Sequence, residues 1–229
     1  MKSLLLLHGA LGSADQLRPL AEALPGHYDL HSLQLPGHGG VPAGDGGFSV
    51  PAFAGFVERY IQEKGLDRPS VFGYSMGGYV ALHLAATRPE LIGAVATLAT
   101  KLDWTPEGAA REAAGLQPDV IEQKVPAFAA ALRERHYPLN WKEVLANTAS
   151  LMQELGRAPL LTDGVLASLT LPVLLLLGDR DNMVTLEETV NARRTIPGAQ
   201  LGVLPATPHP LEKADPKLLA ALLQRFFGS

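Results

Sequence analysis

Short, continuous apolar runs separated by longer amphipathic segments are the feature that most limits how this chain can fold. A strand that is buried on both faces needs apolar side chains at successive positions rather than at alternate ones. Such runs cover residues 3–7, 70–74, 94–99 and 173–177, with weaker candidates at 28–35 and 200–204. Sheets covered on both faces are usually parallel, so the pattern predicts a doubly wound, mostly parallel α/β sheet.

Helix-forming segments lie between these runs. They are expected at residues 13–24, 51–63, 76–87, 186–195 and 217–227. In the last segment leucines and phenylalanines recur at helical spacing, and Asp215 precedes it as a possible N-cap. With 229 residues, the chain has the length of one elaborated domain.

The alternation of strand and helix fails between residues 102 and 169. This stretch has no strand-like run, and helices are expected near residues 106–116, 119–135 and 141–155. A helical insertion between two strands would cover the edge where parallel strands end. We therefore predict a core of residues 1–101 and 170–229 with residues 102–169 as an inserted helical cap. The alternative is additional scaffold that does not contact substrate.

Residues 73–77 read Gly-Tyr-Ser-Met-Gly and join an expected strand to an expected helix. A sharp strand-to-helix turn forces its central residue into a strained conformation and presents that side chain above the sheet. The Gly-x-Ser-x-Gly pattern alone is weak, since it would arise by chance in roughly one chain in ten of this size. Its place between strand and helix makes Ser75 the predicted nucleophile.

A serine hydroxyl needs a base to take its proton and a third group to orient that base. Asp179 and Asp181 directly follow one apolar run, and His209 follows the last one. Both positions are expected at the same edge of the sheet as Ser75.

Five motifs thus occur in order along the chain. They are His8-Gly9-Ala10-Leu11-Gly12, Leu35-Pro36-Gly37-His38-Gly39, the Ser75 turn, Gly178-Asp179-Arg180-Asp181 and His209. Together they resemble the α/β-hydrolase fold, in particular its small capped esterases and carbon–carbon hydrolases, over essentially the whole chain. The resemblance implies that Asp181 is the acid of a Ser-His-Asp triad, with Asp179 serving the turn. Asp103 is the alternative acid, because some relatives carry their acid at that place.

The resemblance also implies two backbone donors for the oxyanion of the reaction. One is the amide of Met76 at a helix N-terminus, where the helix dipole favours negative charge. The other is the amide of Ala10 in the turn after the first strand, with Leu11 as the alternative. Loss of one such donor typically costs about 2.7–4 kcal/mol.

Several larger side chains are candidates for the substrate pocket. They are Leu11, Tyr74, Trp104, His136, Tyr137, Trp141 and Met183. Aromatic residues at such positions more often belong to the core. His8 and His38 lie in turn motifs, where hydrogen bonds that brace the loops explain them better than proton transfer. No cluster of His, Asp and Glu has the spacing of a metal site, and no cofactor is expected.

Charge and composition argue against several other classes of function. The formal net charge of −4 leaves no basic excess for a nucleic acid, and the absence of cysteine excludes disulfides and thiolate chemistry. The apolar start is too short for a secretion signal, and the stretch 171–177 is too short to span a membrane. We expect a cytoplasmic protein with a small-molecule ester-type substrate and no nucleic-acid or membrane partner. The oligomeric state has no sequence signal.

The predicted reaction is hydrolysis of a carboxylic ester or thioester through an acyl-enzyme. A serine nucleophile argues against the relatives that open epoxides or remove halide. As an alternative, the same triad could cleave a carbon–carbon bond or act as a lyase resembling the menaquinone-pathway synthase. The resemblance suggests an Arg in that enzyme where this chain has Tyr79. A non-catalytic ligand sensor ranks lower, because all three triad residues are present.

Overall fold

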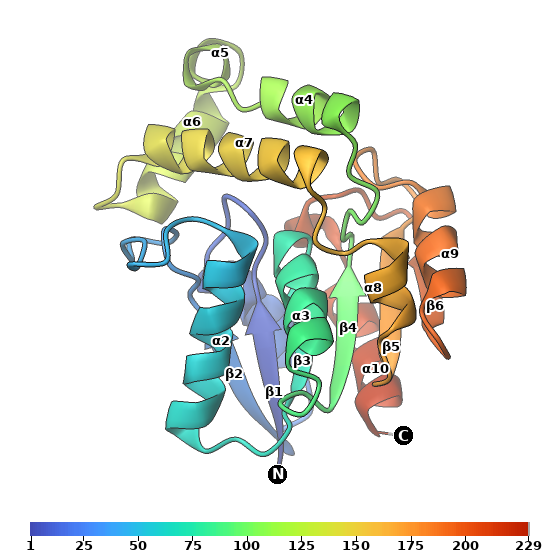
Figure 1. Cartoon of the computed structure of the whole chain (residues 1–229). Helices are drawn as coiled ribbons and strands as arrows, with labels where there is room; N and C mark the ends of the chain where they lie inside the picture. The colour runs from blue at the N-terminus through green and yellow to red at the C-terminus, as the bar shows by residue number, and fades with distance from the viewer. Residues whose placement is uncertain (229) are drawn as a thin grey trace.

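Six parallel strands form the centre of the molecule in the computed structural model, which describes residues 1–228 (Figure 1). Their order across the sheet is β2-β1-β3-β4-β5-β6, and every neighbouring pair is parallel. The strands are β1 (Lys2–Leu7), β2 (Tyr28–Leu33), β3 (Ser70–Tyr74), β4 (Ala94–Leu98), β5 (Val173–Gly178) and β6 (Gln200–Leu204). Because all of them run in one direction, their carboxyl ends meet at one edge of the sheet. The predicted α/β fold class is confirmed.

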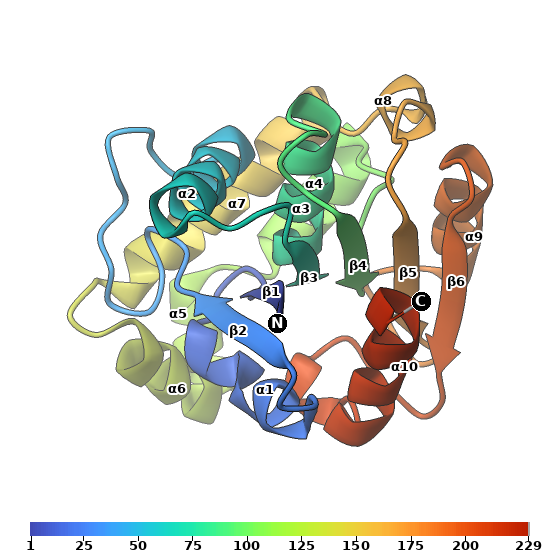
Figure 2. The same ribbon diagram turned by 90° about the horizontal axis from the view of Figure 1, so that it is seen from below.

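Helices cover both faces of this sheet, as the view from below shows (Figure 2). One face carries α1 (Arg18–Ala23) and α10 (Pro216–Gly228). The other face carries α2 (Val50–Lys64), α3 (Met76–Thr87) and α9 (Leu186–Thr195). The sheet is therefore the middle layer of three.

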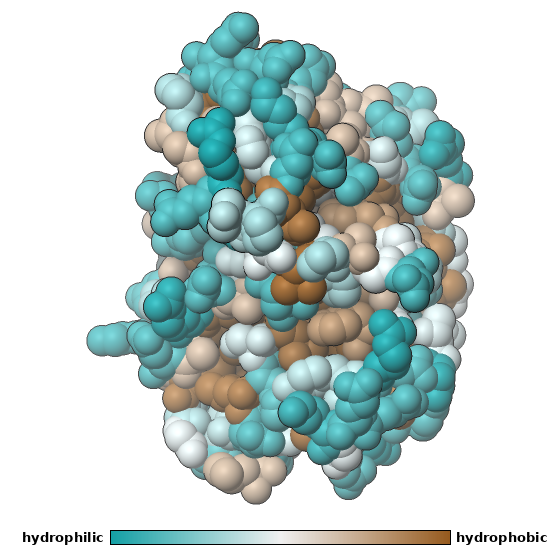
Figure 3. Space-filling model, turned by 90° about the vertical axis from the view of Figure 1, so that its left-hand side faces the viewer, coloured by the Kyte–Doolittle hydropathy of each residue, from teal (hydrophilic) through white to brown (hydrophobic). Residues whose placement is uncertain are grey.

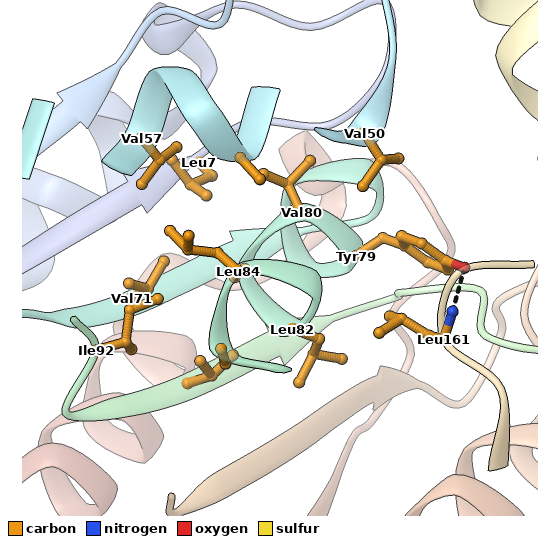
Figure 4. Packing of buried hydrophobic residues seen from close by; sticks show 14 of the residues in the cluster. Leu7, Val50, Val57, Val71, Tyr79, Val80, Leu82, Leu84, Ile92 and Leu161 are labelled. Atoms are coloured by element: carbon orange, nitrogen blue, oxygen red, sulfur yellow. Dashed lines mark hydrogen bonds between the residues drawn. The ribbon is translucent and has the colours of Figure 1, made fainter. Parts of the chain in front are cut away.

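Side chains of the central strand β1 point alternately into the two cores. Leu5 and Leu7 belong to the core formed with α2 and α3, whereas Leu4 and Leu6 belong to the core formed with α1 and α10. All four are fully buried, which explains why the strand is apolar at successive positions. Figure 4 shows part of the first core, where side chains of α3 pack between the sheet and α2.

Four helices lie above the carboxyl ends of the strands (Figure 1). They are α4 (Pro106–Ala114), α5 (Pro118–Lys124), α6 (Pro126–His136) and α7 (Trp141–Arg157). A small core joins three of them, made of Ile121, Ala129, Leu132, Trp141 and Leu145. The short α8 (Asp163–Ala167) instead packs beside α9. The division into a cap of residues 102–169 and a core stays a prediction.

Two predicted helices are each divided at a proline. The helix predicted at 119–135 is wrong as a single unit: α5 ends before Val125, which has φ −139° and ψ 60°, and α6 starts at Pro126. Proline cannot donate the helical hydrogen bond, and it disfavours helical geometry at the residue before it. Likewise the segment predicted at 13–24 consists of a 3₁₀ turn, η1 (Ala14–Leu17), followed by α1 with Pro19 in its first turn.

The predicted N-cap of the last helix is confirmed. The Oδ1 atom of Asp215 accepts hydrogen bonds from the amides of Lys217 and Leu218, at 2.8 and 3.3 Å. These amides belong to the first turn of α10 and have no partner within the helix.

The outer surface of the molecule is mixed in character. On the side seen in Figure 3, hydrophilic side chains dominate the top, and apolar side chains gather toward the middle. Within residues 1–228, no helix is both long enough and apolar enough to cross a lipid bilayer.

Candidate active site

Ser75 occupies a strained turn between β3 and α3. Its backbone has φ 50° and ψ −115°, a conformation that residues with a side chain rarely adopt. A Cβ atom at Gly73 would collide with the backbone of Gly77, and one at Gly77 would lie 2.5 Å from the carbonyl oxygen of Leu7. The turn can be this tight only because both flanking residues are glycine.

Neighbouring elements hold the strained turn in place. The amide of Ser75 donates to the carbonyl oxygen of Leu98 at 2.8 Å, which ties the turn to β4. The hydroxyl of Thr100 donates to the carbonyl oxygen of Ser75 at 3.0 Å. The surrounding structure therefore fixes the conformation that presents the Ser75 hydroxyl.

The carboxyl ends of β3, β5 and β6 bring Ser75, Asp181 and His209 together. Oγ of Ser75 lies 3.4 Å from Nε2 of His209. On the other side of the ring, Nδ1 of His209 lies 2.8 Å from Oδ2 and 3.1 Å from Oδ1 of Asp181. The first distance is long for a hydrogen bond, as is common in free enzymes before substrate closes the geometry.

The surroundings of the Asp181 carboxylate stabilise its charged form. Its side chain is 1% exposed, and burial by itself would raise its pKa. Hydrogen bonds from His209 and from the amides of Val184 and Met183 outweigh that effect and hold the pKa below its usual value. Asp181 is therefore ionised at neutral pH, with its carboxylate directed at the imidazole ring of His209.

The other two aspartates named by the sequence lie apart from His209. Oδ1 of Asp179 accepts the amide of Thr207 at 3.1 Å, so Asp179 joins the loops after β5 and β6, as expected for a turn residue. Asp103 lies after β4 and lines a separate surface cavity near α8 and α9. The carboxylate that contacts His209 belongs to Asp181.

Ala10 and Met76 line the same cavity as Ser75. Among residues 1–228, no protein group accepts a hydrogen bond from either amide. The Met76 amide is at the N-terminus of α3, where the helix dipole favours an anion. Leu11, the alternative donor, has φ 57° and packs against the small core of the helices above the sheet.

The cavity beside Ser75 contains about 400 Å³ of space that atoms do not fill, part of it open to solvent. Its walls are mostly apolar, and α7 contributes one side of it. The lining residues are Ala10, Val50, Ser75, Met76, Tyr79, Lys101, Trp104, Leu151, Met152, Leu155 and Met183.

Two of the seven predicted pocket residues, Trp104 and Met183, line this cavity. The other five do not line it. Tyr137 is 79% exposed, and Trp141 packs in the small core above the sheet.

The remaining three predicted pocket residues support the loops around the site. The Tyr74 hydroxyl donates to the carbonyl oxygen of His209 at 3.0 Å. His136 is fully buried; its Nδ1 accepts the Gly39 amide at 3.1 Å, and its Nε2 donates to the carbonyl oxygen of Leu11 at 3.2 Å. Arg135 donates to the same oxygen at 2.8 Å.

Six residues that line the cavity were not predicted from the sequence: Val50, Tyr79, Lys101, Leu151, Met152 and Leu155. The apolar face of α7 was visible in the sequence, but only the docking of the helix decides which end of that face covers Ser75. Trp141 and Leu145 lie at the end that packs against α6, whereas Leu151 and Met152 lie at the end above the cavity.

Three buried histidines brace the loops beside the site. His8 donates from Nδ1 to the carbonyl oxygen of Gly9 at 2.8 Å and accepts the Leu35 amide at Nε2 at 3.1 Å. Burial lowers the pKa of His8 and of His136 to about 4, and that of His38 to about 3. All three are neutral at pH 7, and their hydrogen bonds match the expected bracing role of His8 and His38.

No group of three or more His, Cys, Asp or Glu side chains within residues 1–228 is arranged to hold a metal ion.

A parallel sheet with a strained serine between strand and helix, followed by an aspartate and a histidine at later strand ends, is the arrangement of α/β-fold hydrolases. The chain belongs to the alpha/beta hydrolase fold family, whose family model matches residues 2–138. The resemblance predicted from the five motifs is confirmed.

Comparison with known proteins adds two relatives of known name. The chain is 34% identical over 119 residues to pimeloyl-[acyl-carrier protein] methyl ester esterase of Citrobacter koseri, covering 52% of this chain and 43% of that protein. It is 38% identical over 99 residues to the dihydrolipoyllysine-residue acetyltransferase component of the acetoin cleaving system of Cupriavidus necator, covering 42% of this chain and 25% of that protein. The chain thus spans less than half the length of these two relatives.

Among solved structures, carboxylesterase CesB (YbfK) of Bacillus subtilis superposes with a TM-score of 0.76 at 20% identity. The match covers 100% of this chain and 84% of that one. At this identity the likeness shows the shared fold.

Proposed function

We propose that this protein is a serine hydrolase that cleaves a carboxylic ester or thioester of a small molecule through an acyl-enzyme. The observation that carries the proposal is the alignment of Ser75, His209 and Asp181, with His209 between the other two, at the edge of an apolar cavity. The esterase name of the Citrobacter koseri relative supports the same class of reaction.

In the proposed first half-reaction, Oγ of Ser75 attacks the carbonyl carbon of the substrate. Nε2 of His209 takes the hydroxyl proton, and the ionised Asp181 stabilises the imidazolium that forms. The carbonyl oxygen becomes an oxyanion, for which the amides of Ala10 and Met76 are the proposed donors. His209 then gives its proton to the leaving alcohol or thiol, and an acyl-Ser75 ester remains.

In the second half-reaction a water molecule replaces the alcohol. His209 removes a proton from this water as it attacks the acyl-enzyme, and returns the proton to Oγ of Ser75 as the carboxylic acid leaves. Each half thus uses the same base and the same two amides.

The apolar walls favour a hydrocarbon part of the substrate next to the reacting carbonyl. Leu151, Met152 and Leu155 of α7 face this space, so we propose that α7 limits the size of the group that fits there. Burial of apolar surface stabilises such a complex by about 25 cal/mol per Å².

Turnover of a series of short aryl esters tests the proposal. We expect Ser75→Ala to abolish turnover, whereas the matched variant Ser150→Ala, at an exposed position of α7, keeps it. Full turnover in Ser75→Ala would contradict the proposed mechanism. Labelling of Ser75 without turnover of any ester would favour the carbon–carbon hydrolase or lyase alternative, and absence of both would favour a ligand sensor.

A further inference from the structure

Among the described residues 1–228, Lys101 is the one charged residue that lines the cavity beside Ser75. It follows β4, and its side chain is only 12% exposed. Its ammonium group lies 5.7 Å from the ring centroid of Trp104, another residue of the cavity wall. A cation in a mostly apolar wall is costly to bury and calls for a specific role.

Glu188 of α9 holds Lys101 near the cavity. Its Oε2 lies 3.6 Å from Nζ of Lys101, and its side chain is 6% exposed. Its Oε1 accepts the amides of Leu102 and Asp103 at 2.6 and 2.8 Å. Glu188 therefore fixes both the loop that carries Lys101 and the position of its ammonium group.

The pairing of these two side chains leaves hydrogen-bonding capacity on the lysine. At 3.6 Å the contact is an ion pair beyond hydrogen-bond length, and within residues 1–228 Nζ of Lys101 donates no hydrogen bond. An ammonium group has three donors. Two amides already offset part of the negative charge of Glu188, so the pair can accept a further anion at lower cost.

We propose that Lys101 forms a subsite for a carboxylate of the substrate, so that the preferred substrates are esters or thioesters whose acyl chain ends in a carboxylate. This inference rests on the proposed hydrolase function. The apolar walls would bind the methylene chain, and Lys101 would bind the anion at its end through charge-assisted hydrogen bonds. Tyr79, another polar residue of the cavity wall, uses its hydroxyl to accept the amides of Leu160 and Leu161.

Matched pairs of aryl esters test this subsite. One member of each pair is the monoester of a dicarboxylic acid, and the other is the ester of the monocarboxylic acid of equal length. In the unaltered protein we expect a lower KM for the anionic member. In Lys101→Met the KM for that member should rise about tenfold, while the neutral member changes less than about twofold.

Two further variants separate recognition from folding and from overall charge. Lys124→Met removes an exposed lysine of α5 and should leave both KM values unchanged. The double variant Lys101→Met/Glu188→Gln removes both charges, so that no buried carboxylate is left unpaired, and should show the same selective loss for the anionic ester. Equal losses for both esters in this double variant would overturn the subsite.

Binding to an inactive protein distinguishes failure of the subsite from failure of the hydrolase proposal. Monomethyl adipate, an anionic monoester, is titrated calorimetrically into Ser75→Ala and into Ser75→Ala/Lys101→Met. We expect measurable binding to the first and about tenfold weaker binding to the second. Equal binding to both, or no binding to the first, would overturn the carboxylate subsite whether or not any ester is hydrolysed.

Discussion

Nε2 of His136 donates a hydrogen bond to the carbonyl oxygen of Leu11 across 3.2 Å. This contact joins the end of α6, above the sheet, to the turn after β1 that carries Ala10. A helix that lies far from Ser75 in the sequence thus supports one of the two proposed oxyanion donors.

Replacement of His136 by alanine tests this support. Loss of the ring leaves the partly buried amide of Gly39 without its partner and leaves Arg135 as the remaining side-chain donor to the Leu11 carbonyl oxygen. We expect the free energy of unfolding to fall by about 1–3 kcal/mol and kcat to fall more than KM rises, because the transition state uses the oxyanion donors. Denaturant unfolding and ester kinetics measure both effects. His27→Ala, at an exposed position, is the control, and an unchanged kcat in His136→Ala would contradict this role.

Stability should fall as the pH falls from about 6.5 to about 4. In this range His8, His38 and His136 stay neutral in the folded protein, because burial lowers their pKa values to about 4, 3 and 4. The unfolded chain binds protons at histidines below about pH 6.5, so it is favoured as the pH drops, by up to about 1.4 kcal/mol per pH unit for each histidine. Urea unfolding between pH 7 and pH 4.5 measures this slope.

The variant His38→Leu isolates one contribution to that slope. Nε2 of His38 is buried without a hydrogen-bond partner in residues 1–228, and its ring stacks on Phe48 at 4.8 Å. We expect the variant to lose stability less steeply with falling pH than the unaltered protein. An identical slope in His38→Leu would show that His38 does not contribute.

The tight turn at Ser75 should not tolerate a methyl group at Gly77. A Cβ atom there would lie 2.5 Å from the carbonyl oxygen of Leu7, so the backbone of β1 or α3 must shift. We expect Gly77→Ala to lower the free energy of unfolding by roughly 2 kcal/mol or more and to lower kcat. Gly44→Ala is the matched control, because nothing lies within 4 Å of its Cβ position. Equal stability of the two variants would argue against the close approach.

Tyr74 should position His209 rather than bind substrate. Its hydroxyl donates to the His209 carbonyl oxygen at 3.0 Å, and its ring lies outside the cavity wall. We expect Tyr74→Phe to lower kcat by about tenfold with little change in KM. A large rise in KM with unchanged kcat would instead indicate a contact with substrate.

The sequence allowed the sheet and the Ser75 turn to be predicted because their signals are local. The apolar run before Ser75 and the helix after it, Met76–Thr87, match the structure at every boundary. Pro126 was visible in the sequence, but the amphipathic pattern on both sides of it led to the prediction of one continuous helix where the structure has two.

About half of the cavity wall could not be predicted, because its contacts join residues that are distant in the sequence. Lys101 meets Glu188 only because β4 and β5 are neighbours in the sheet and α9 follows β5. Likewise, whether Trp141 or Met152 covers Ser75 depends on how α7 lies across the strand ends. Helical periodicity in a sequence indicates which face of a helix is buried, but not which residues that face contacts.

Covalent labelling with a fluorophosphonate, followed by intact-mass analysis and peptide mapping, tests most directly that His209 activates Ser75 as a nucleophile. We predict one label per chain, located on Ser75, with no label in Ser75→Ala and labelling slowed by about a thousandfold or more in His209→Ala. Ser150→Ala should label as fast as the unaltered protein. Labelling that persists in Ser75→Ala, or an unaltered protein that takes up no label, would contradict the proposed nucleophile.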